Sequence, residues 1–359
     1  MGRRRAANGH TQPFNVRHWE VGNELWGRWQ FHWTTATGNV DRYRRFAKAM
    51  LAADPAIQLY ACGAPVFWGK AWNDALIAGL GPELRSITDH PLIGGDVALT
   101  ADPLDVFRDF MAVPGVLESK WAALREDLAR GGVREPRLAV TELQVFAHLG
   151  PRGDTNLPVR LTRDSLPAQG SITEALYDVL IYHAAVRLQP FVEMITHSAT
   201  VNHGGGLRKE RERVYANPCH DAQALFAAFA GATPVGITVD APVQRAPLVL
   251  PELRNVARAH ESKAVDALAA VAPNGELLVS LVNETMSPVA LAVELKDFPA
   301  AAQAVVISLS AGTPWAGNSL ERPRAVEPQS TTVALQGSRF ELGLKPFSVT
   351  RVRVPVKRD

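Results

Sequence analysis

The sequence is poor in cysteine and carries no surplus of either charge. Its 359 residues include two cysteines, Cys62 and Cys219, which are too few for a disulfide framework or a zinc site of cysteines alone. We expect both to be buried free thiols. The 38 basic and 36 acidic side chains leave a formal net charge of +2. Proteins that bind polyanions need a larger or more clustered basic excess, so nucleic acid is not expected as the main partner.

Long apolar runs are also missing. A membrane-spanning helix needs about 18 or more consecutive apolar residues, and no such run occurs. The basic segment Met1–Arg5 is not followed by the apolar stretch of a secretory signal, so we expect a cytoplasmic protein that does not bind membranes. Apolar residues make up 47% and charged residues 21% of the chain, values typical of globular proteins, which excludes disorder over the whole chain.

Up to about residue 230, short apolar runs alternate with helical stretches, a rhythm typical of βα units and a parallel sheet. The predicted strands are Asn15–Val21, Ile57–Cys62, Ser86–His90, Leu138–Thr141 and Phe191–Thr196. The predicted helices are Asp41–Ala53, Lys70–Leu80, Pro103–Arg130, a helix to Leu188 opened by a capping box at Ser171–Glu174, and Asp221–Ala230. We expect Gly204–Arg213 to be a solvated loop.

From Pro234 onward the apolar runs become short and rich in Val, Leu, Thr and Ser. The predicted strands are Leu277–Asn283, Val289–Leu295, Val305–Leu309, Thr331–Leu335, Phe340–Leu344 and Ser348–Val354, with a hairpin turn at Asn274–Gly275. Six or more strands with turn residues between them favour a β-sandwich. We therefore expect an α/β domain over residues 1–232 and an all-β domain over residues 233–359.

Two glutamates stand where parallel α/β barrels gather their functional groups, at the carboxyl ends of strands. Glu24 follows the first predicted strand and Glu142 follows the fourth. One protonated and one ionised carboxyl group are the minimal machinery for glycoside hydrolysis. The aromatic residues Trp19, Trp26 and Trp29 surround Glu24 in sequence; apolar neighbours raise a carboxyl pKa, and flat rings suit sugars. The alternative is that both are ordinary surface carboxylates at strand ends.

The segment Trp19–Gln30 resembles the acid/base segment of the α-L-arabinofuranosidases of glycoside hydrolase family 51, which belong to a clan of retaining (β/α)8-barrel enzymes. The resemblance implies that Glu24 is the general acid/base and that Glu142, three strands later, is the nucleophile. It also implies that Asn23 hydrogen-bonds the 2-hydroxyl of the sugar.

Four further residues are expected to contact the substrate. Trp26 belongs to the matched segment, and His90 and Asn202 match the family more weakly. Gln144 follows Leu143, where the family often has tryptophan, and we expect it to compensate by hydrogen bonding. Neither a metal nor another cofactor is implied, because the two carboxylates suffice. The spacing of His197, His203, Cys219 and His220 matches no tetrahedral site.

The resemblance also implies that the chain holds barrel strands four to eight of a TIM barrel, followed by the C-terminal β-sandwich. The acid/base strand is normally the fourth, yet here it begins about fifteen residues from Met1. Three βα units and a preceding sandwich strand are then missing, and five strands cannot close an eight-stranded barrel. We expect a fragment of a longer protein, a chain completed by a partner, or a chain that is not a working enzyme.

The function implied is the hydrolysis of terminal non-reducing α-L-arabinofuranosyl residues from arabinose-containing oligosaccharides, by a retaining double displacement. Homo-oligomers are common in the family and fit this chain. Two alternatives stay open. One is another retaining glycosidase of the same clan, such as a β-xylosidase or an endoglucanase. The other is an inactive remnant that at most binds carbohydrate.

Overall fold

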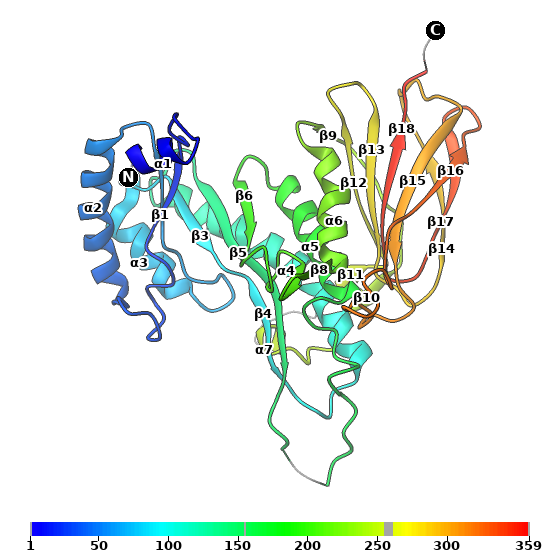
Figure 1. Ribbon diagram of the computed structural model, residues 1–359, viewed down its shortest axis with the longest axis horizontal. Helices are drawn as coiled ribbons and strands as arrows, with labels where there is room; N and C mark the ends of the chain where they lie inside the picture. The colour runs from blue at the N-terminus through cyan, green and yellow to red at the C-terminus, as the bar shows by residue number, and fades with distance from the viewer. Residues whose placement is uncertain (1, 154–155, 255–260, 358–359) are drawn as a thin grey trace. The chain divides into compact units, whose positions relative to one another are not determined.

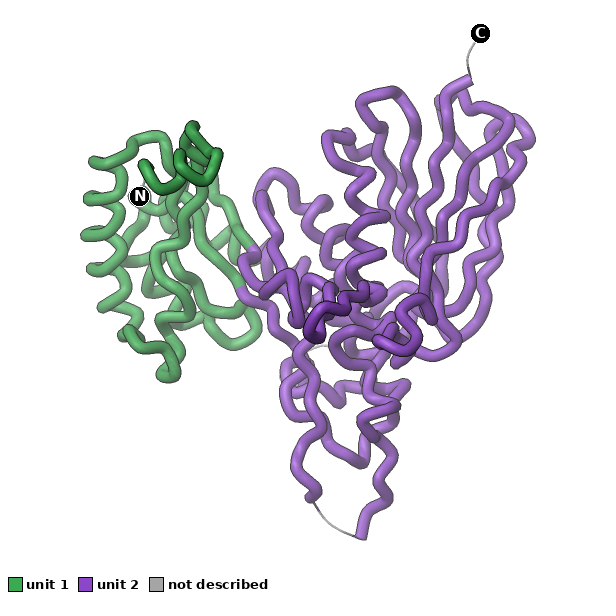
Figure 2. The backbone as a smooth tube through the Cα atoms, in the orientation of Figure 1, with its two compact units in different colours: residues 1–89, 123–139 green, residues 90–122, 140–359 purple. Residues whose placement is uncertain are grey.

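The computed structural model describes residues 2–153, 156–254 and 261–357 (Figure 1). These residues form two compact units, coloured separately in Figure 2. Unit 1 comprises residues 1–89 and 123–139, and unit 2 comprises residues 90–122 and 140–359.

Unit 1 is built on three parallel strands. They are β1 (His18–Val21), β2 (Gln58–Ala61) and β3 (Ser86–Asp89), paired in that order. The helices are α1 (Gly2–Ala7), α2 (Ala36–Ala53), α3 (Lys70–Leu80) and the end of α4 (Pro103–Arg130). All four residues of β3 are buried, as expected for a parallel strand covered on both faces.

Strand β5 (Arg137–Leu149) begins in unit 1, where it neighbours β3, and continues in unit 2. In unit 2 it pairs in parallel with β4 (Leu92–Val97), from Leu92 opposite Gln144 to Val97 opposite Leu149. The sequence prediction, which ended this strand at Thr141 and omitted β4, was wrong here. Pro91, Gly94 and Gly95 are residue types that are common in turns. In the structure, however, β4 runs through both glycines, each of which has a positive φ.

The α-helical part of unit 2 surrounds one buried helix. Helix α5 (Ile172–Arg187) is buried along most of its length and packs against α6 (Pro218–Phe226). Unit 2 also contains the first part of α4, the strand β6 (Val192–His197), which pairs with β5, the hairpin β7 (Leu207–Glu210) and β8 (Arg213–Ala216), and α7 (Pro251–Arg254). The hairpin corrects the predicted loop at Gly204–Arg213.

The predicted capping box at α5 does not form as expected. Ser171 is the N-cap, but its hydroxyl donates to the carbonyl of Ala168 (2.6 Å) and caps no helical N–H. Glu174 reaches back one residue further, accepting from the N–H of Gly170 (2.7 Å). The Ser-x-x-Glu spacing therefore located the start of the helix correctly but not its hydrogen bonds.

Antiparallel sheets make up the rest of unit 2. The larger sheet has the order β16-β15-β18-β13-β12-β9, and the smaller sheets are β14-β17 and β10-β11. Their bounds are β9 Thr233–Val235, β10 Val243–Arg245, β11 Glu261–Lys263, β12 Val265–Val271, β13 Leu277–Asn283, β14 Val289–Glu294, β15 Gln303–Ser310, β16 Gln329–Ala334, β17 Arg339–Leu344 and β18 Ser348–Val354. Side chains of the larger sheet and of β14-β17 share one apolar core.

Several sequence predictions are confirmed at residue level. Lys70–Leu80, Pro103–Arg130, Leu277–Asn283 and Ser348–Val354 have the predicted bounds. Gly275 has a φ of 85° in the β12–β13 turn, which only glycine adopts freely. Both cysteines are buried free thiols.

No helix among the described residues is long and apolar enough to cross a bilayer. Strand β9 begins at Thr233, and the division into domains 1–232 and 233–359 stays a prediction.

Candidate active site

The first candidate residue, Glu24, sits on a tight turn that directly follows β1. The backbone leaves the strand through Gly22, with a φ of 106°, and Glu24 itself has a φ of 46°. A non-glycine residue in the left-handed region is strained, and such residues cluster at functional sites. The next residue, Leu25, is buried, and its N–H donates to the thiol sulfur of Cys62 at the end of β2 (3.4 Å). The turn is thereby attached to the neighbouring strand.

Two side chains from the same turn bind the Glu24 carboxylate. Trp29 Nε1 and Gln30 Nε2 both donate to Glu24 Oε2, at 3.0 and 3.3 Å. A Cβ at Gly27 would come within 2.5 Å of the Trp29 ring, so the absence of a side chain there lets the indole reach the carboxylate. Two hydrogen bonds to the same oxygen fix the orientation of the Glu24 carboxyl group.

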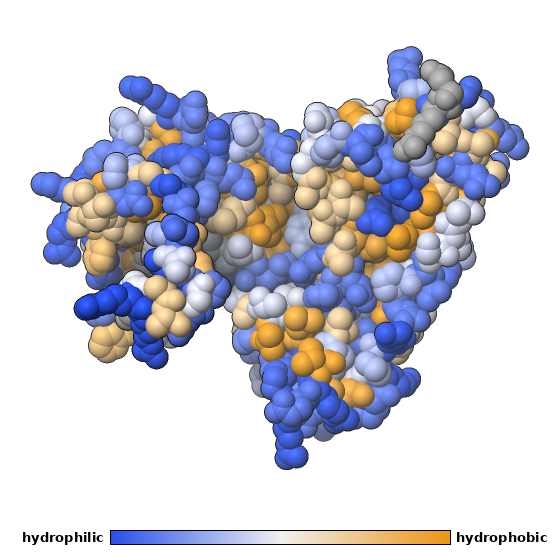
Figure 3. Space-filling view, turned by 45° about the horizontal axis from the view of Figure 1, so that its top comes forward, coloured by the Kyte–Doolittle hydropathy of each residue, from blue (hydrophilic) through white to orange (hydrophobic). Residues whose placement is uncertain are grey.

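Three tryptophans of unit 1 form an aromatic cluster beside this turn. Trp26 makes edge-on contacts with Trp29 and with Trp68, with ring centroids 5.1 and 4.6 Å apart. Its indole N–H donates to the carbonyl of Gly63 (3.0 Å). Trp29 and Trp68 are 69% and 59% exposed. Figure 3 shows patches of hydrophobic residues among hydrophilic ones on the surface of the chain. Exposed indole faces suit the flat C–H surfaces of sugars. Asn23, on the same turn, is exposed.

A polar network that sequence reasoning missed lies under the turn. Thr88 Oγ1 donates to Glu20 Oε1 (2.8 Å) and accepts from the N–H of Gly63 (3.1 Å). Thr88 is buried on β3, and Glu20 is on β1. The network therefore links three neighbouring strands at the edge that carries Glu24. In the sequence, this network is indicated by a polar residue, Thr88, inside a short predicted strand.

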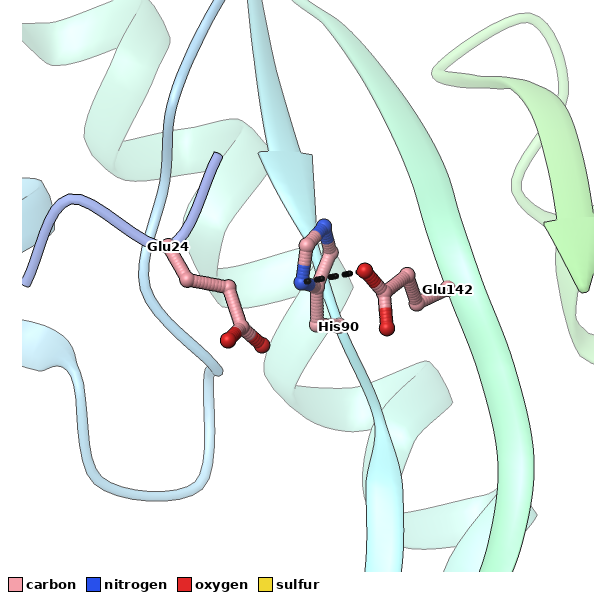
Figure 4. A group of neighbouring side chains, drawn as sticks. All are labelled: Glu24, His90 and Glu142. Carbon is pink, nitrogen blue, oxygen red and sulfur yellow. Dashed lines mark ion pairs between the residues drawn. The ribbon is translucent and has the colours of Figure 1, made fainter. Parts of the chain in front are cut away.

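In unit 2, His90 and Glu142 lie side by side (Figure 4). His90 directly follows β3 and is 5% exposed. Its Nε2 is 2.8 Å from the hydroxyl of Thr141, and its Nδ1 is 3.8 Å from Glu142 Oε1. Thr141 therefore fixes the imidazole next to the carboxylate. The Glu142 side chain keeps 27% of its surface exposed. Glu24, also drawn in Figure 4, belongs to unit 1.

The strand that carries Glu142 is anchored by β6 and the residues after it. Thr196 Oγ1 donates to the carbonyl of Thr141 (2.8 Å), and the N–H of Ser198 donates to the carbonyl of Leu143 (3.3 Å). Gln144, a predicted substrate contact, is 4% exposed, and its amide oxygen accepts from the Ser198 hydroxyl. Its role toward a substrate stays a prediction.

Asn202, the last predicted substrate contact, has structural partners. Its backbone is left-handed, with a φ of 62°. Its amide oxygen accepts from the N–H of Lys209 (2.8 Å), and its amide nitrogen donates to the carbonyl of the same residue (3.2 Å). The side chain thus holds the start of the β7-β8 hairpin, and contact with a sugar stays a prediction.

A second group of carboxyls lies on α5, away from solvent. Glu174 and Asp178 are both fully buried. Burial raises the pKa of Glu174 from 4.5 to about 7, and burial together with the charge of Glu174 raises the pKa of Asp178. Nearby, burial lowers the pKa of His197 to about 4, so it is neutral, and its Nε2 is 2.7 Å from the Tyr182 hydroxyl. Sequence reasoning missed Glu174 and Asp178 as a pair because their spacing is that of an ordinary helix face.

Comparison with known proteins places the chain in a family. The model described as "Alpha-L-arabinofuranosidase 1 domain" matches residues 1–79, which include the Glu24 turn. The model described as "Alpha-L-arabinofuranosidase C-terminal domain" matches residues 158–348, more than half of the chain. The chain belongs to the α-L-arabinofuranosidase family. The family predicted from Trp19–Gln30 is thereby confirmed.

The chain is also similar to individual proteins in sequence or in fold. Alpha-L-arabinofuranosidase C of Emericella nidulans is 39% identical over 66 residues, which are 18% of this chain and 13% of that protein. The α-L-arabinofuranosidase of Thermotoga maritima, solved as an arabinose complex, superposes with a TM-score of 0.75 at 18% identity, covering 98% of this chain and 69% of that one. A family 51 α-L-arabinofuranosidase from Bifidobacterium longum gives 0.77 at 18% identity, with coverages of 98% and 70%. The matched solved chains are longer than this one.

Proposed function

We propose that this chain hydrolyses terminal non-reducing α-L-arabinofuranosyl residues from arabinose-containing oligosaccharides, with Glu142 as the nucleophile and Glu24 as the general acid/base. The observation that carries the proposal is the Glu24 turn. A strained backbone presents the carboxylate, and Trp29 and Gln30 orient it, within the segment that matches the family. The His90–Glu142 contact gives the second carboxylate a defined orientation.

In the first step of the proposed reaction, Glu142 attacks the anomeric carbon. The glycosidic C–O bond breaks, and Glu24 donates its proton to the leaving oxygen, which gives a covalent glycosyl-enzyme. In the second step, Glu24 takes a proton from water, and the oxygen of that water attacks the anomeric carbon. Glu142 then leaves as a carboxylate, and the configuration is retained. This mechanism requires the two carboxyl groups to come about 5–5.5 Å apart.

The remaining predicted residues have supporting parts in this proposal. Asn23 hydrogen-bonds the 2-hydroxyl, and Trp26 carries the aromatic wall on which the sugar rests. His90 holds Glu142 at the attacking angle. Gln144 and Asn202 contact the substrate through the hydrogen-bonding capacity that their bonds to the protein leave unused.

We further propose that β1, β2, β3, β5 and β6 correspond to strands four to eight of the barrel, and that the antiparallel region is the family's β-sandwich. A cytoplasmic location and uptake of short oligosaccharides fit this assignment, as does a homo-oligomer. A curated relative that matches 16% of the chain, from Bacillus subtilis, is named an intracellular exo-arabinofuranosidase.

The test is the hydrolysis of p-nitrophenyl α-L-arabinofuranoside by the purified chain and by its Glu24→Ala and Glu142→Ala variants. Azide distinguishes the two roles, because a small anion can replace the missing group. It should restore turnover with retained configuration in Glu24→Ala and with inverted configuration in Glu142→Ala. Glu135→Gln, a change at an exposed glutamate of unit 1, is the matched control and should keep full activity.

Two further measurements separate the alternatives. Turnover of p-nitrophenyl β-xylopyranoside in preference to the arabinofuranoside would indicate another glycosidase of the clan. A folded chain that binds arabino-oligosaccharides without turnover would indicate a carbohydrate-binding remnant. Glutamate and histidine also ligate divalent metals, so the assay is repeated after EDTA treatment. We expect the same rate, and a loss restored by a divalent cation would contradict the two-carboxylate mechanism.

A further inference from the structure

A cavity of about 320 Å³ lies in unit 2, between two helices and the antiparallel strands. Its walls come from the first part of α4, the second half of α5, the strands β11 and β12, and the segments that follow β9 and β13. The volume is at the lower end of the range for small-molecule sites. The described residues that line it include none of the predicted catalytic or substrate-contact residues.

One carboxyl group on the wall of this cavity is buried without a full set of partners. Glu284, which directly follows β13, lines the cavity and is 3% exposed. Burial raises the pKa of Glu284 well above 4.5, and a hydrogen bond with the Ser262 side chain opposes the rise. Its Oε2 has no hydrogen-bond partner among the described residues. Buried polar groups are normally hydrogen-bonded, so a donor that enters the cavity and bonds to Oε2 is stabilised there.

The cationic side chains on the walls, by contrast, already bond to acceptors of the protein. Arg187 pairs with Asp266 (2.6 Å) and with Glu118 (3.3 Å). The ammonium group of Lys263 donates to the carbonyl of Val239 (3.5 Å). The walls therefore offer an open carboxyl oxygen beside cations that are engaged, an arrangement that favours a positively charged ligand over an anion.

Apolar side chains form much of the remaining wall. Met111 on α4 and Leu180 on α5 are buried, whereas Ile237 is 41% exposed. An alkyl chain placed against these side chains is removed from water, which is favourable. The cavity thus combines one polar end for a donor with apolar walls for a short hydrocarbon.

We infer that this cavity is a binding site for a small primary alkylammonium ion. The ammonium group donates to Oε2 of Glu284, and the alkyl chain lies along Met111 and Leu180 toward the exposed Ile237. The site shares no residue with the proposed catalytic machinery. Its test is therefore a binding measurement, which does not depend on whether the chain hydrolyses arabinofuranosides.

The probes are pentylammonium chloride, 1-pentanol and sodium pentanoate, which share an alkyl chain and differ in charge. In isothermal titration calorimetry on the full chain at pH 7, pentylammonium should bind at least about tenfold more tightly than either of the others. Glu284→Gln keeps the size of the side chain and removes its charge, and it should weaken the binding of pentylammonium about tenfold or more. Glu341→Gln, at an exposed position of β17 outside the cavity, is the matched control.

A second variant tests the same cavity if Glu284→Gln fails to fold. A Cβ at Gly115, on the α4 wall, would meet no atom within 4 Å, so Gly115→Leu adds bulk at the cavity without a backbone clash. It should weaken the binding of pentylammonium about tenfold. Ser119→Leu is its control, because Ser119 is exposed one turn further along α4 and outside the lining residues.

Binding that prefers pentylammonium, and that Glu284→Gln loses while Glu341→Gln keeps it, would support the inference. Three outcomes would overturn it. The absence of pentylammonium binding at tens of millimolar would mean that the cavity holds water only. Equal binding of 1-pentanol would reduce the site to an apolar cavity that does not recognise charge. Tighter binding of pentanoate would show that the engaged cations, rather than Glu284, select the ligand.

Discussion

Unit 2 contains two groups of carboxyl side chains that differ in burial and partners. Glu142 on β5 is partly exposed and lies beside His90, which Thr141 holds in place. Glu174 and Asp178 on α5 are fully buried, and within the described residues a carboxylate oxygen of each has no hydrogen-bond partner. The Glu142 carboxylate is accessible to a substrate, whereas the carboxyls of Glu174 and Asp178 are not.

The comparison shows that burial distinguishes a carboxylate that is available for catalysis from carboxyls that are enclosed in the fold. Perturbed pKa values are often taken to mark active sites. Here the largest rises of carboxyl pKa occur at buried positions, including Glu174 and Asp178, for which desolvation is the first cause. The catalytic roles that we propose therefore rest on exposure and contact geometry, and we propose no catalytic role for the buried α5 carboxyls.

The largest expected effect concerns the exposed carboxylate. Glu142→Gln keeps the size of the side chain and removes the nucleophile, so kcat for the aryl arabinofuranoside should fall by roughly 10⁴-fold or more. Glu174→Gln, the matched change on α5, should leave kcat within a few-fold. Steady-state kinetics at 25 °C measures both. Equal losses in the two variants would show that exposure does not separate the two groups.

The next effect concerns the buried pair and the pH dependence of stability. Burial raises the pKa of Glu174 from 4.5 to about 7. The folded state then binds more protons than the unfolded state between these values. The contribution of Glu174 is therefore complete below about pH 4.5 and is lost as the pH rises through 7, by roughly 3 kcal/mol in total.

Urea unfolding of the wild-type chain and of Glu174→Gln, at several pH values from about 4.5 to about 7.5, measures the contribution of Glu174 together with its coupling to Asp178, because groups outside this pair cancel in the difference. The variant should gain stability relative to the wild type as the pH rises. A difference that does not vary with pH would mean that Glu174 is ionised in the folded chain.

The same contrast explains what the sequence could reveal. Glu24 and Glu142 were identifiable because each follows or lies in a short apolar strand, and because the Glu24 turn matches a family. The residues that orient them were harder to find. The hydrogen bond between Thr141 and His90 depends on the register of neighbouring strands, which the sequence does not give. Strand β4 was missed because Pro91 and two glycines are typical of a turn. Glu174 and Asp178 have i,i+4 spacing, which in sequence is typical of a solvated helix face.

A smaller effect is expected at His90, which acts through Glu142. His90→Ala should lower kcat up to roughly 10²-fold by releasing the carboxylate, with little change in KM. His148→Ala is the control, because His148 is exposed on β5, the strand that carries Glu142. Partial recovery in His90→Gln, whose amide can still bond Thr141, would separate positioning from loss of packing. An unchanged kcat in His90→Ala would remove His90 from the proposed site.

The smallest effect tests the hydrogen bond that orients Glu24. Trp29→Phe keeps an aromatic ring and removes the indole N–H that donates to Glu24 Oε2, while Gln30 still donates to the same oxygen. A hydrogen bond contributes about 0.5–1.5 kcal/mol net, so we expect the loss of this one to lower kcat/KM by up to about tenfold. Trp68→Phe changes the other ring in contact with Trp26 and has no such bond to Glu24 among the described contacts. Equal losses in the two variants would assign the effect to aromatic packing, whereas a loss confined to Trp29→Phe would assign it to the carboxylate.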